Sequence, residues 1–356
     1  MARLDTFLRI AADQAASDLH FHAGKVPCVR HDGELVPLPF RVLSEHQVRG
    51  FLDEILTERQ RDRLARDQHV DFAYELEGVA RYRASVCWQS GGLGAVFRVI
   101  PPEIPSIDDL ELPAAVAGFT HHANGLVLVT GPTGSGKTTT LAALVDKINA
   151  TSGRHIITVE DPIEYVHAPK QGLVTQREVG LHAQSFGAAL RSALREAPDV
   201  LVVGEMRDYE TVSLALGAAE TGVLVFATLH TGSAAKSIDR VLGTCPSDQQ
   251  DQVREVLSML LRGAVSQRLC RSAGGGRVAA LEILLQSISV SHLIREQKIH
   301  QIDSYLRGGE AARGMCSLED ALLRLVQLER ITKEVALAEA NDLEAMRSML
   351  KKAEAA

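Results

Sequence analysis

The feature that most constrains this chain is a glycine-rich loop between a strand pattern and a helix pattern. Residues 131–138 read GPTGSGKT, which fits G-x-x-x-x-G-K-[ST]. The apolar run at 125–130 predicts a buried strand, and residues 138–149 predict a helix with one apolar face. Strand, loop and helix in this order place a polyphosphate at the positive end of the helix. The pattern therefore predicts a nucleoside triphosphate site.

Each part of the loop has a role in phosphate binding. The glycines let backbone N–H groups turn toward the phosphates. Lys137 can reach the β- and γ-phosphates, and the Thr138 hydroxyl can bind Mg²⁺. We therefore expect ATP and Mg²⁺ as ligands. The predicted nucleotide-binding residues are Gly131, Pro132, Thr133, Gly134, Ser135, Gly136, Lys137, Thr138 and Thr139.

Composition and charge favour some classes of protein over others. The 356 residues are 46% hydrophobic and 23% charged, which is typical of a soluble chain with about two domains. The net charge of −7 disfavours a nucleic-acid partner, because such proteins usually carry a basic face. The five cysteines form no C-x-x-C pair, so we expect free thiols in a reducing compartment and no zinc.

No segment has the pattern of an export signal or a membrane span. Asp5, Arg9 and Asp13 interrupt the N-terminal region where a signal-peptide core would lie. No uncharged apolar run approaches the ~20 residues that a bilayer requires. We expect a cytoplasmic protein, and docking on a membrane machine is compatible with this expectation.

The chain predicts four consecutive regions. Residues 1–100 mix short helix and strand patterns, which predicts a small α+β domain with an Asp-Gly hairpin at 30–35. Clustered prolines predict a stiff linker over 101–113. Residues 114–288 alternate strands with helices, which predicts an α/β domain with a mostly parallel sheet covered on both faces. Residues 289–356 predict a helical C-terminal region. The strands expected in the α/β domain are 126–130, 155–159, 200–203, 223–228 and 278–284.

Carboxylates flank the strand predicted at 200–203. In parallel α/β sheets, ligands lie beyond the carboxyl ends of the strands. Glu205 follows the carboxyl end, whereas Asp199 lies at the amino end, about 20 Å away. Glu205 is therefore the better candidate for an acidic contact to Mg²⁺, partly through water. Asp199 is interpreted as a loop or capping residue.

Three further carboxylates, Glu160, Asp161 and Glu164, follow the strand predicted at 155–159. Carboxylates this close together repel one another unless a cation or a proton separates them. Hydrolysis needs a group that orients the attacking water, and we expect one of the three to supply it. The alternative is a solvated acidic turn.

Histidines and arginines supply the remaining candidates. His230 follows the strand predicted at 223–228 and is expected near the γ-phosphate; a buried histidine bonded to the backbone is the alternative. Arg81 and Arg83 share one strand face, from which arginines can reach a neighbouring subunit's γ-phosphate; plain surface arginines are the alternative. His20 and His22 make a poor metal site without a third ligand, so a hydrogen-bonded surface pair is the interpretation.

The order of these blocks resembles that of a known superfamily. GPTGSGKTTT, ITVEDPIEYVH, DVLVVGEMRD and TLHT resemble the Walker A, Asp box, Walker B and His box of secretion ATPases. Across nearly its whole length the chain is similar to the type IV pilus retraction ATPases, the PilT family. Further matching segments are SDLHFHAG, ARYR, GAVFRVIP, QREVG, GGGRVAALEIL and LIRE.

The resemblance implies a hexameric ring that hydrolyses ATP to power pilus retraction and twitching motility. Each subunit would have a PAS-like first domain and a RecA-like second domain, with ATP between it and a neighbour's first domain. Glu164 would be the catalytic base, Glu205 the Walker B acid and His230 the His-box residue. Arg81 and Arg83 would act on the neighbouring subunit. The ring would sit at the cytoplasmic face of the inner membrane, reaching the membrane only through partners such as the pilus platform protein.

Two segments depart from the family pattern. Only residues 293–296 match the longer tail motif that the family uses in retraction, because the preceding residues 289–292 differ. Cys270 and Arg271 stand where assembly-type relatives insert a four-cysteine zinc element, which this sequence lacks. The alternatives are an accessory retraction paralogue, a pilus assembly or type II secretion ATPase and, more distantly, a RecA-like nucleic-acid translocase.

Overall fold

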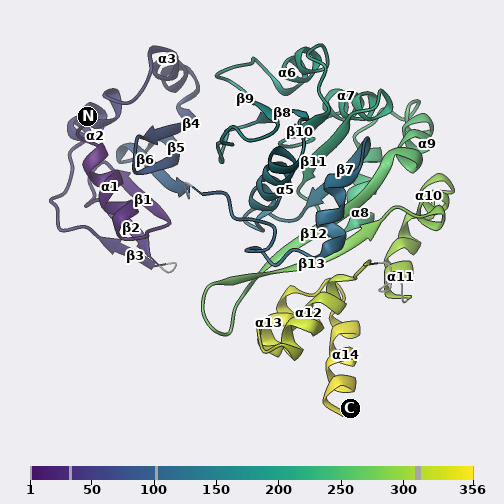
Figure 1. The fold of residues 1–356 in the computed structure, drawn as a ribbon. Helices are drawn as coiled ribbons and strands as arrows, with labels where there is room; N and C mark the ends of the chain where they lie inside the picture. The colour runs from purple at the N-terminus through teal and green to yellow at the C-terminus, as the bar shows by residue number, and fades with distance from the viewer. Residues whose placement is uncertain (1, 32–33, 101–102, 309–313, 356) are drawn as a thin grey trace. The chain divides into compact units, whose positions relative to one another are not determined.

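The computed structural model describes residues 2–31, 34–100, 103–308 and 314–355, which form two compact units (Figure 1). The first unit comprises Met1–Ile104 with Pro162–Val166, and the second comprises Pro105–Asp161 with His167–Ala356. Both units combine helices with a β-sheet, which confirms the predicted α/β fold class. Pro101 and Pro102 of the predicted linker lie outside the described residues.

The first unit is built on a six-stranded antiparallel sheet of order β3-β2-β1-β6-β5-β4. Alternate strand side chains such as Leu19, Phe21 and Phe97 are buried against the helices. The pairing of β2 with β3 confirms the predicted hairpin, although residues 32–33 at its turn lie outside the described part of the chain. The elements are α1 (Asp5–Asp13), β1 (Asp18–His22), β2 (Cys28–His31), β3 (Glu34–Pro37), α2 (Glu45–Asp53), α3 (Glu58–Asp67), β4 (His69–Leu76), β5 (Ala80–Gln89) and β6 (Gly92–Ile100).

The second unit contains a seven-stranded sheet of order β13-β12-β7-β11-β10-β8-β9. Neighbouring strands from β12 to β9 pair in parallel, and only β13 runs antiparallel, at the edge. The mostly parallel sheet is therefore confirmed. The strands are β7 (Gly125–Thr130), β8 (His155–Glu160), β9 (Leu173–Glu178), β10 (Val200–Val203), β11 (Leu224–Leu229), β12 (Leu261–Arg271) and β13 (Arg277–Leu285).

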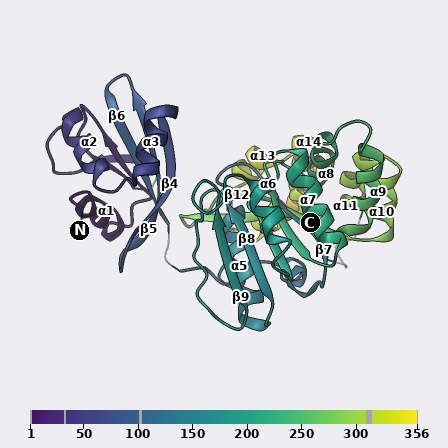
Figure 2. The same cartoon turned by 90° about the horizontal axis from the view of Figure 1, so that it is seen from above.

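Helices cover both faces of this sheet, as the layers in Figures 1 and 2 show. Leu126 and Leu128 of β7 pack among residues of α6 to α9, whereas Val127 and Val129 pack against α5 and the segment that precedes β7. Successive strand residues point to opposite faces, so a continuous apolar run fills two cores. The helices are α4 (Ala114–Ala117), η1 (Gly118–His121), α5 (Lys137–Thr151), α6 (Phe186–Ala193), α7 (Tyr209–Glu220), α8 (Ala234–Gly243) and α9 (Gln250–Leu260).

The C-terminal region is helical, as predicted. Its last three helices bury Leu318, Leu322 and Met346 against side chains of β12 and β13 such as Cys270 and Val278. Ser317 caps α12 by accepting a hydrogen bond from the Asp320 N–H at 3.2 Å. The elements are α10 (Ile288–Arg295), η2 (Ile299–Gln301), α11 (Ile302–Arg307), α12 (Leu318–Gln327), α13 (Lys333–Glu339) and α14 (Leu343–Ala355).

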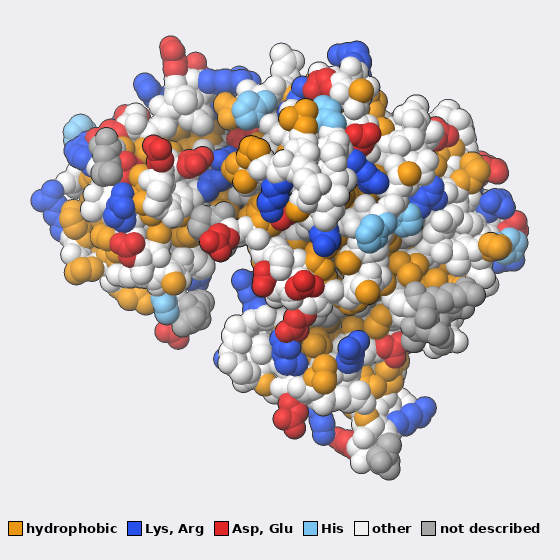
Figure 3. Space-filling model, in the orientation of Figure 1, with side chains coloured by type: hydrophobic (Ala, Val, Ile, Leu, Met, Phe, Trp, Pro, Cys, Tyr) orange, Lys and Arg blue, Asp and Glu red, His pale blue; other side chains and the backbone are white. Residues whose placement is uncertain are grey.

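The surface carries charges of both signs. On the face drawn in Figure 3, acidic and basic side chains are interspersed among apolar and neutral ones. None of the helices in the described part of the chain has the run of apolar residues that a transmembrane span requires.

Candidate nucleotide-binding site

The glycine-rich loop follows β7, at the carboxyl ends of the parallel strands. Gly131, Gly134 and Gly136 have φ values of 144°, 79° and 89°, which side chains rarely tolerate. A Cβ on Gly131 would lie 2.4 Å from the Gln267 carbonyl oxygen and 2.5 Å from Ser135 Oγ. The glycines are therefore required by the conformation of the loop and by its close approach to β12.

Lys137 begins α5 and turns back over the loop. Its Nζ donates hydrogen bonds to the carbonyl oxygens of Gly131 at 2.9 Å and Pro132 at 3.0 Å. The Ser135 hydroxyl is buried, with no hydrogen-bond partner among the described residues. A buried ammonium and a buried unpaired hydroxyl within one loop are suited to phosphate oxygens, because each would otherwise cost desolvation free energy. The loop therefore fits a nucleotide polyphosphate.

Gln267 of β12 supports the loop from behind. Its side-chain oxygen accepts a hydrogen bond from Thr140 Oγ1 at 2.9 Å, and the same amide would lie 2.8 Å from a Cβ on Gly136. Gln267 is 4% exposed. Sequence reasoning missed this residue because β12 was not predicted, and a single glutamine between Ser266 and Arg268 gives no local signal.

Glu205 and His230 lie close to Lys137, also at the carboxyl ends of the parallel strands. They follow β10 and β11, and β11 lies between β10 and β7. His230 Nδ1 lies 3.5 Å from Lys137 Nζ, and His230 Nε2 lies 3.4 Å from a Glu205 carboxylate oxygen. The structure thus brings three of the predicted site residues together. Thr138 and Thr139 lie in the first turn of α5, beside Lys137.

Arg207 controls the charge of Glu205. Its guanidinium lies 2.7 Å from the Glu205 carboxylate. Burial raises the pKa of Glu205, but the hydrogen bond and the charge of Arg207, helped by His230, outweigh burial and hold that pKa below its usual value. Glu205 is therefore an ionised carboxylate at neutral pH. Arg207 belongs to the DVLVVGEMRD segment that resembles the Walker B block, but the sequence alone predicted no role for it.

The three acids after β8 separate into two groups. Glu160 accepts hydrogen bonds from Thr158 Oγ1 of its own strand at 2.6 Å and from Gln176 Nε2 of β9 at 3.2 Å, and these two bonds fix its carboxylate. Asp161 is exposed and lies in the same unit. Glu164 belongs to the segment that the structure groups with the first unit.

Within the first unit, Glu164 lies beside both predicted arginines. Arg83 Nη1 lies 3.4 Å from Glu164 Oε1, and Arg81 Nε donates to the Ile163 carbonyl oxygen at 3.2 Å. Arg81 also lies 3.3 Å from Glu75. The arginines therefore have partners within their own chain in this state, and Glu164 is paired with Arg83.

Asp199 and the paired histidines have structural roles. Asp199 Oδ2 accepts a hydrogen bond from the His155 N–H at 2.8 Å, which confirms its interpretation as a loop residue. His22 Nδ1 lies 3.2 Å from Gln89 Nε2, whereas His20 Nε2 is buried without a hydrogen-bond partner among the described residues. The interpretation as a hydrogen-bonded surface pair therefore fits His22 but not His20, and the two ring centroids are 6.0 Å apart.

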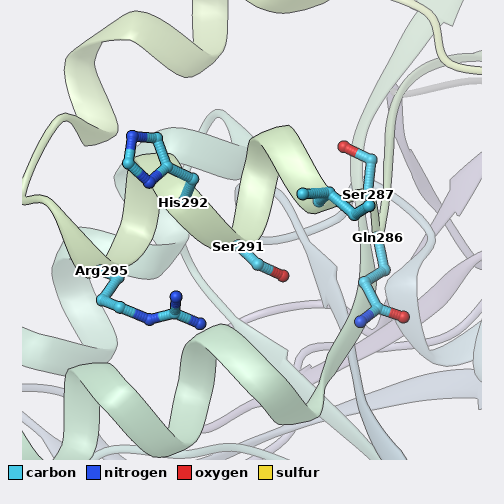
Figure 4. A pocket seen from close by; sticks show the side chains of 6 residues that line it. Gln286, Ser287, Ser291, His292 and Arg295 are labelled. Atoms are coloured by element: carbon cyan, nitrogen blue, oxygen red, sulfur yellow. The ribbon is translucent and has the colours of Figure 1, made fainter.

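A separate hollow of about 540 Å³ lies beside α10 (Figure 4). Gln286, Ser287, Ser291, His292 and Arg295 line it together with Ile288, which is 92% exposed. None of the predicted nucleotide-binding residues is among these lining residues. The hollow includes Arg295 of the matched LIRE segment, whose Nε lies 4.0 Å from Glu255.

Comparison with known proteins shows the family of the chain. Residues 4–353 match the family model described as type II/IV secretion system protein. The chain is 46% identical over 92% of its length to the type IV pilus retraction ATPase PilT of Pseudomonas aeruginosa, covering 95% of that protein. It is 43% identical over 96% of its length to a twitching motility protein of Neisseria gonorrhoeae, covering 91% of it.

A solved structure shows the same fold. The crystal structure of the pilus retraction motor PilT with bound ADP matches at a TM-score of 0.89 and 44% identity, covering 98% of this chain and 99% of that one. The match to the family model and the relatives covered over nearly their whole length lead to one conclusion. The chain belongs to the type II/IV secretion system protein family.

Proposed function

We propose that this chain is the subunit of a hexameric motor that hydrolyses ATP to retract type IV pili. The observation that carries the proposal is the meeting of Lys137, Glu205 and His230 beside the phosphate-binding loop, in a chain 46% identical to a pilus retraction ATPase. The alignment covers 95% of that relative, so the likeness extends over nearly its whole length.

The loop supplies the binding energy for the phosphates. The N–H groups of residues 134–138, at the positive end of α5, would donate hydrogen bonds to the phosphate oxygens. Lys137 Nζ would exchange the carbonyl oxygens of Gly131 and Pro132 for phosphate oxygens, which carry full negative charge. His230, beside Lys137, would donate a hydrogen bond to the γ-phosphate. Binding of the γ-phosphate would thus affect the position of the loop that follows β11.

Thr138 and Glu205 fit Mg²⁺. A hydroxyl and an ionised carboxylate are the oxygen ligands that this cation takes, often partly through water. When bound, Mg²⁺ neutralises charge on the β- and γ-phosphates. Arg207 holds Glu205 in its ionised form and fixes the direction of the carboxylate through the 2.7 Å contact.

Glu164 is the proposed base, as its position in the Asp box suggests. A carboxylate that orients the attacking water contributes typically ~10²–10⁴-fold to the rate. In the present state Glu164 is paired with Arg83, so catalysis would require Arg83 to release it. Arg81 and Arg83 are proposed to act on the γ-phosphate of a neighbouring subunit, where arginine charge stabilises the transition state.

The proposed setting is the cytoplasmic face of the inner membrane. The ring would reach the membrane only through partners, in particular the pilus platform protein, with no role for nucleic acid or zinc. Opening and closing of subunit interfaces during hydrolysis would move the ring and withdraw pilin from the base of the filament.

The test is ATP turnover by the purified full chain. Wild-type protein should hydrolyse ATP with Mg²⁺, and Lys137→Ala should abolish both turnover and tight nucleotide binding. Absence of turnover in the assembled wild-type ring would contradict the proposal and favour an accessory paralogue. Strong stimulation by single-stranded DNA would instead support the nucleic-acid translocase.

A further inference from the structure

The C-terminal helices contact the loop that carries His230. Asn341, between α13 and α14, donates a hydrogen bond from Nδ2 to the Gly232 carbonyl oxygen at 3.0 Å. Its Oδ1 accepts a hydrogen bond from Arg268 Nη2 of β12 at 3.1 Å. Both ends of the amide are used, and a carboxamide is the side-chain group that offers one acceptor and adjacent donors in this way.

The contact is close and leaves little freedom to the loop. A Cβ on Gly232 would lie 2.8 Å from Arg268 Nη2 and 3.9 Å from Asn341 Oδ1. Gly232 follows His230 by two residues, and His230 touches both Lys137 and Glu205. A displacement of Gly232 would therefore also move His230, which is only two residues away, relative to Lys137 and Glu205.

Asn341 is itself fixed by its neighbour Asp342. The Asp342 N–H donates to Glu319 Oε1 at 2.9 Å, and the Asp342 carboxylate lies 2.9 Å from Arg307 Nη1. These contacts attach the segment between α13 and α14 to α12, through Glu319, and to α11, through Arg307. The position of Asn341 therefore follows the arrangement of the tail helices.

The same loop is held again where α8 begins. The Ala234 N–H donates to Glu282 Oε1 of β13 at 2.6 Å, and Glu282 is buried. The backbone from His230 to Ala234 is thus attached to the outer strands and the tail at two points. Of these two attachments, the one through Asn341 comes from the tail, and the described residues show no other hydrogen bond from the tail to this stretch.

We propose that Asn341 is a positioning residue for the nucleotide site. It holds the Gly232 carbonyl so that His230 stays between Lys137 and Glu205, and it makes the turnover rate depend on the packing of α12 to α14. This inference rests on the proposed function. It predicts an effect on catalysis rather than on nucleotide affinity, because Asn341 touches neither the glycine-rich loop nor Lys137 in any contact found among the described residues.

Two substitutions separate the hydrogen bonds of Asn341. Asn341→Ala removes both bonds, whereas Asn341→Asp keeps an acceptor for Arg268 and loses the donor to Gly232. We expect both variants to lower kcat about three- to tenfold, the range for losing the one hydrogen bond to Gly232 that both variants lack, with KM for ATP within about twofold of wild type. Arg347→Ala is the matched control, because it removes an exposed ion pair with Glu344 from the same tail.

A second readout does not depend on turnover. Hydrogen exchange should be faster in a peptide covering residues 229–234 of Asn341→Ala, and unchanged in a peptide covering residues 137–149. If wild type itself has no turnover, the proposed function fails while hydrogen exchange still tests Asn341. The inference is overturned by unchanged exchange in 229–234, by a kcat of Asn341→Asp equal to wild type, or by parallel loss of kcat, ADP affinity and thermal stability.

Discussion

Replacing Glu282 by glutamine should make the protein more stable at high pH. Burial, the largest cause, raises the pKa of Glu282 to about 7; the N–H groups of Ala234 and Leu318 oppose the rise, and the charges of Asp303 and Glu319 add to it. The unfolded chain loses this proton near 4.5. Native protein therefore binds more protons between these values, and its stability falls as pH rises through them.

The magnitude follows from the two pKa values. A pKa difference of about 2.5 corresponds to at most about 3.4 kcal/mol, of which about 2.5 kcal/mol is lost between pH 5 and pH 8. Glutamine resembles the protonated acid and still offers an oxygen to the Ala234 N–H. Glu282→Gln should therefore gain about 2.5 kcal/mol relative to wild type on going from pH 5 to pH 8.

Thermal unfolding at the two pH values measures this gain. The difference in melting temperature between Glu282→Gln and wild type should shift by about 3–5 °C in favour of the variant on going from pH 5 to pH 8. Glu220→Gln makes the same chemical change at an exposed position of α7 and should show no such difference. An equal effect of Glu282→Gln at both pH values would refute the reasoning, because it would mean that Glu282 does not hold a proton in the native state.

Three further substitutions test the site. Glu164→Gln should bind ATP but hydrolyse it about 10²–10⁴-fold more slowly in a steady-state assay; if Glu160→Gln is the inactive variant instead, the assignment of the base is wrong. Arg81→Ala should reduce ATP hydrolysis only in the assembled ring, and an equal loss in separated subunits would argue against a role on the neighbouring subunit. Gly131→Ala should weaken binding of a fluorescent ADP analogue about tenfold or more, since its Cβ would lie 2.4 Å from the Gln267 carbonyl oxygen. Gly153→Ala, where a Cβ meets nothing within 4 Å, should bind like wild type.

Continuous apolar strands and local loop chemistry were predictable from the sequence. The strands β7, β8, β10 and β11 are buried on both faces over most of their length and read as largely apolar runs. The rule that ligands lie beyond strand carboxyl ends then selected Glu205 and His230, which the structure brings to Lys137. These inferences needed only residues close together in the chain.

Residues that act across long sequence distances were not predictable. β9 and β12 were missed because their polar residues interrupt the apolar pattern; β9 is an edge strand, and β12 directs Gln267 and Arg268 toward the loops and the tail. Thr140 meets Gln267 across 127 positions, and Gly232 meets Asn341 across 109. The periodic pattern of apolar residues along a helix or strand contains no information about such distant contacts, so they can be identified only in the folded structure.

Observation of labelled pili on living cells tests the central claim most directly. In a strain whose gene for this chain is deleted, pili should extend but fail to retract. Wild-type protein should restore retraction, and a Lys137→Ala protein expressed at the same level should not. Retraction at the wild-type frequency in the deletion strain, or its full restoration by Lys137→Ala, would contradict the account of this chain as an ATP-driven retraction motor.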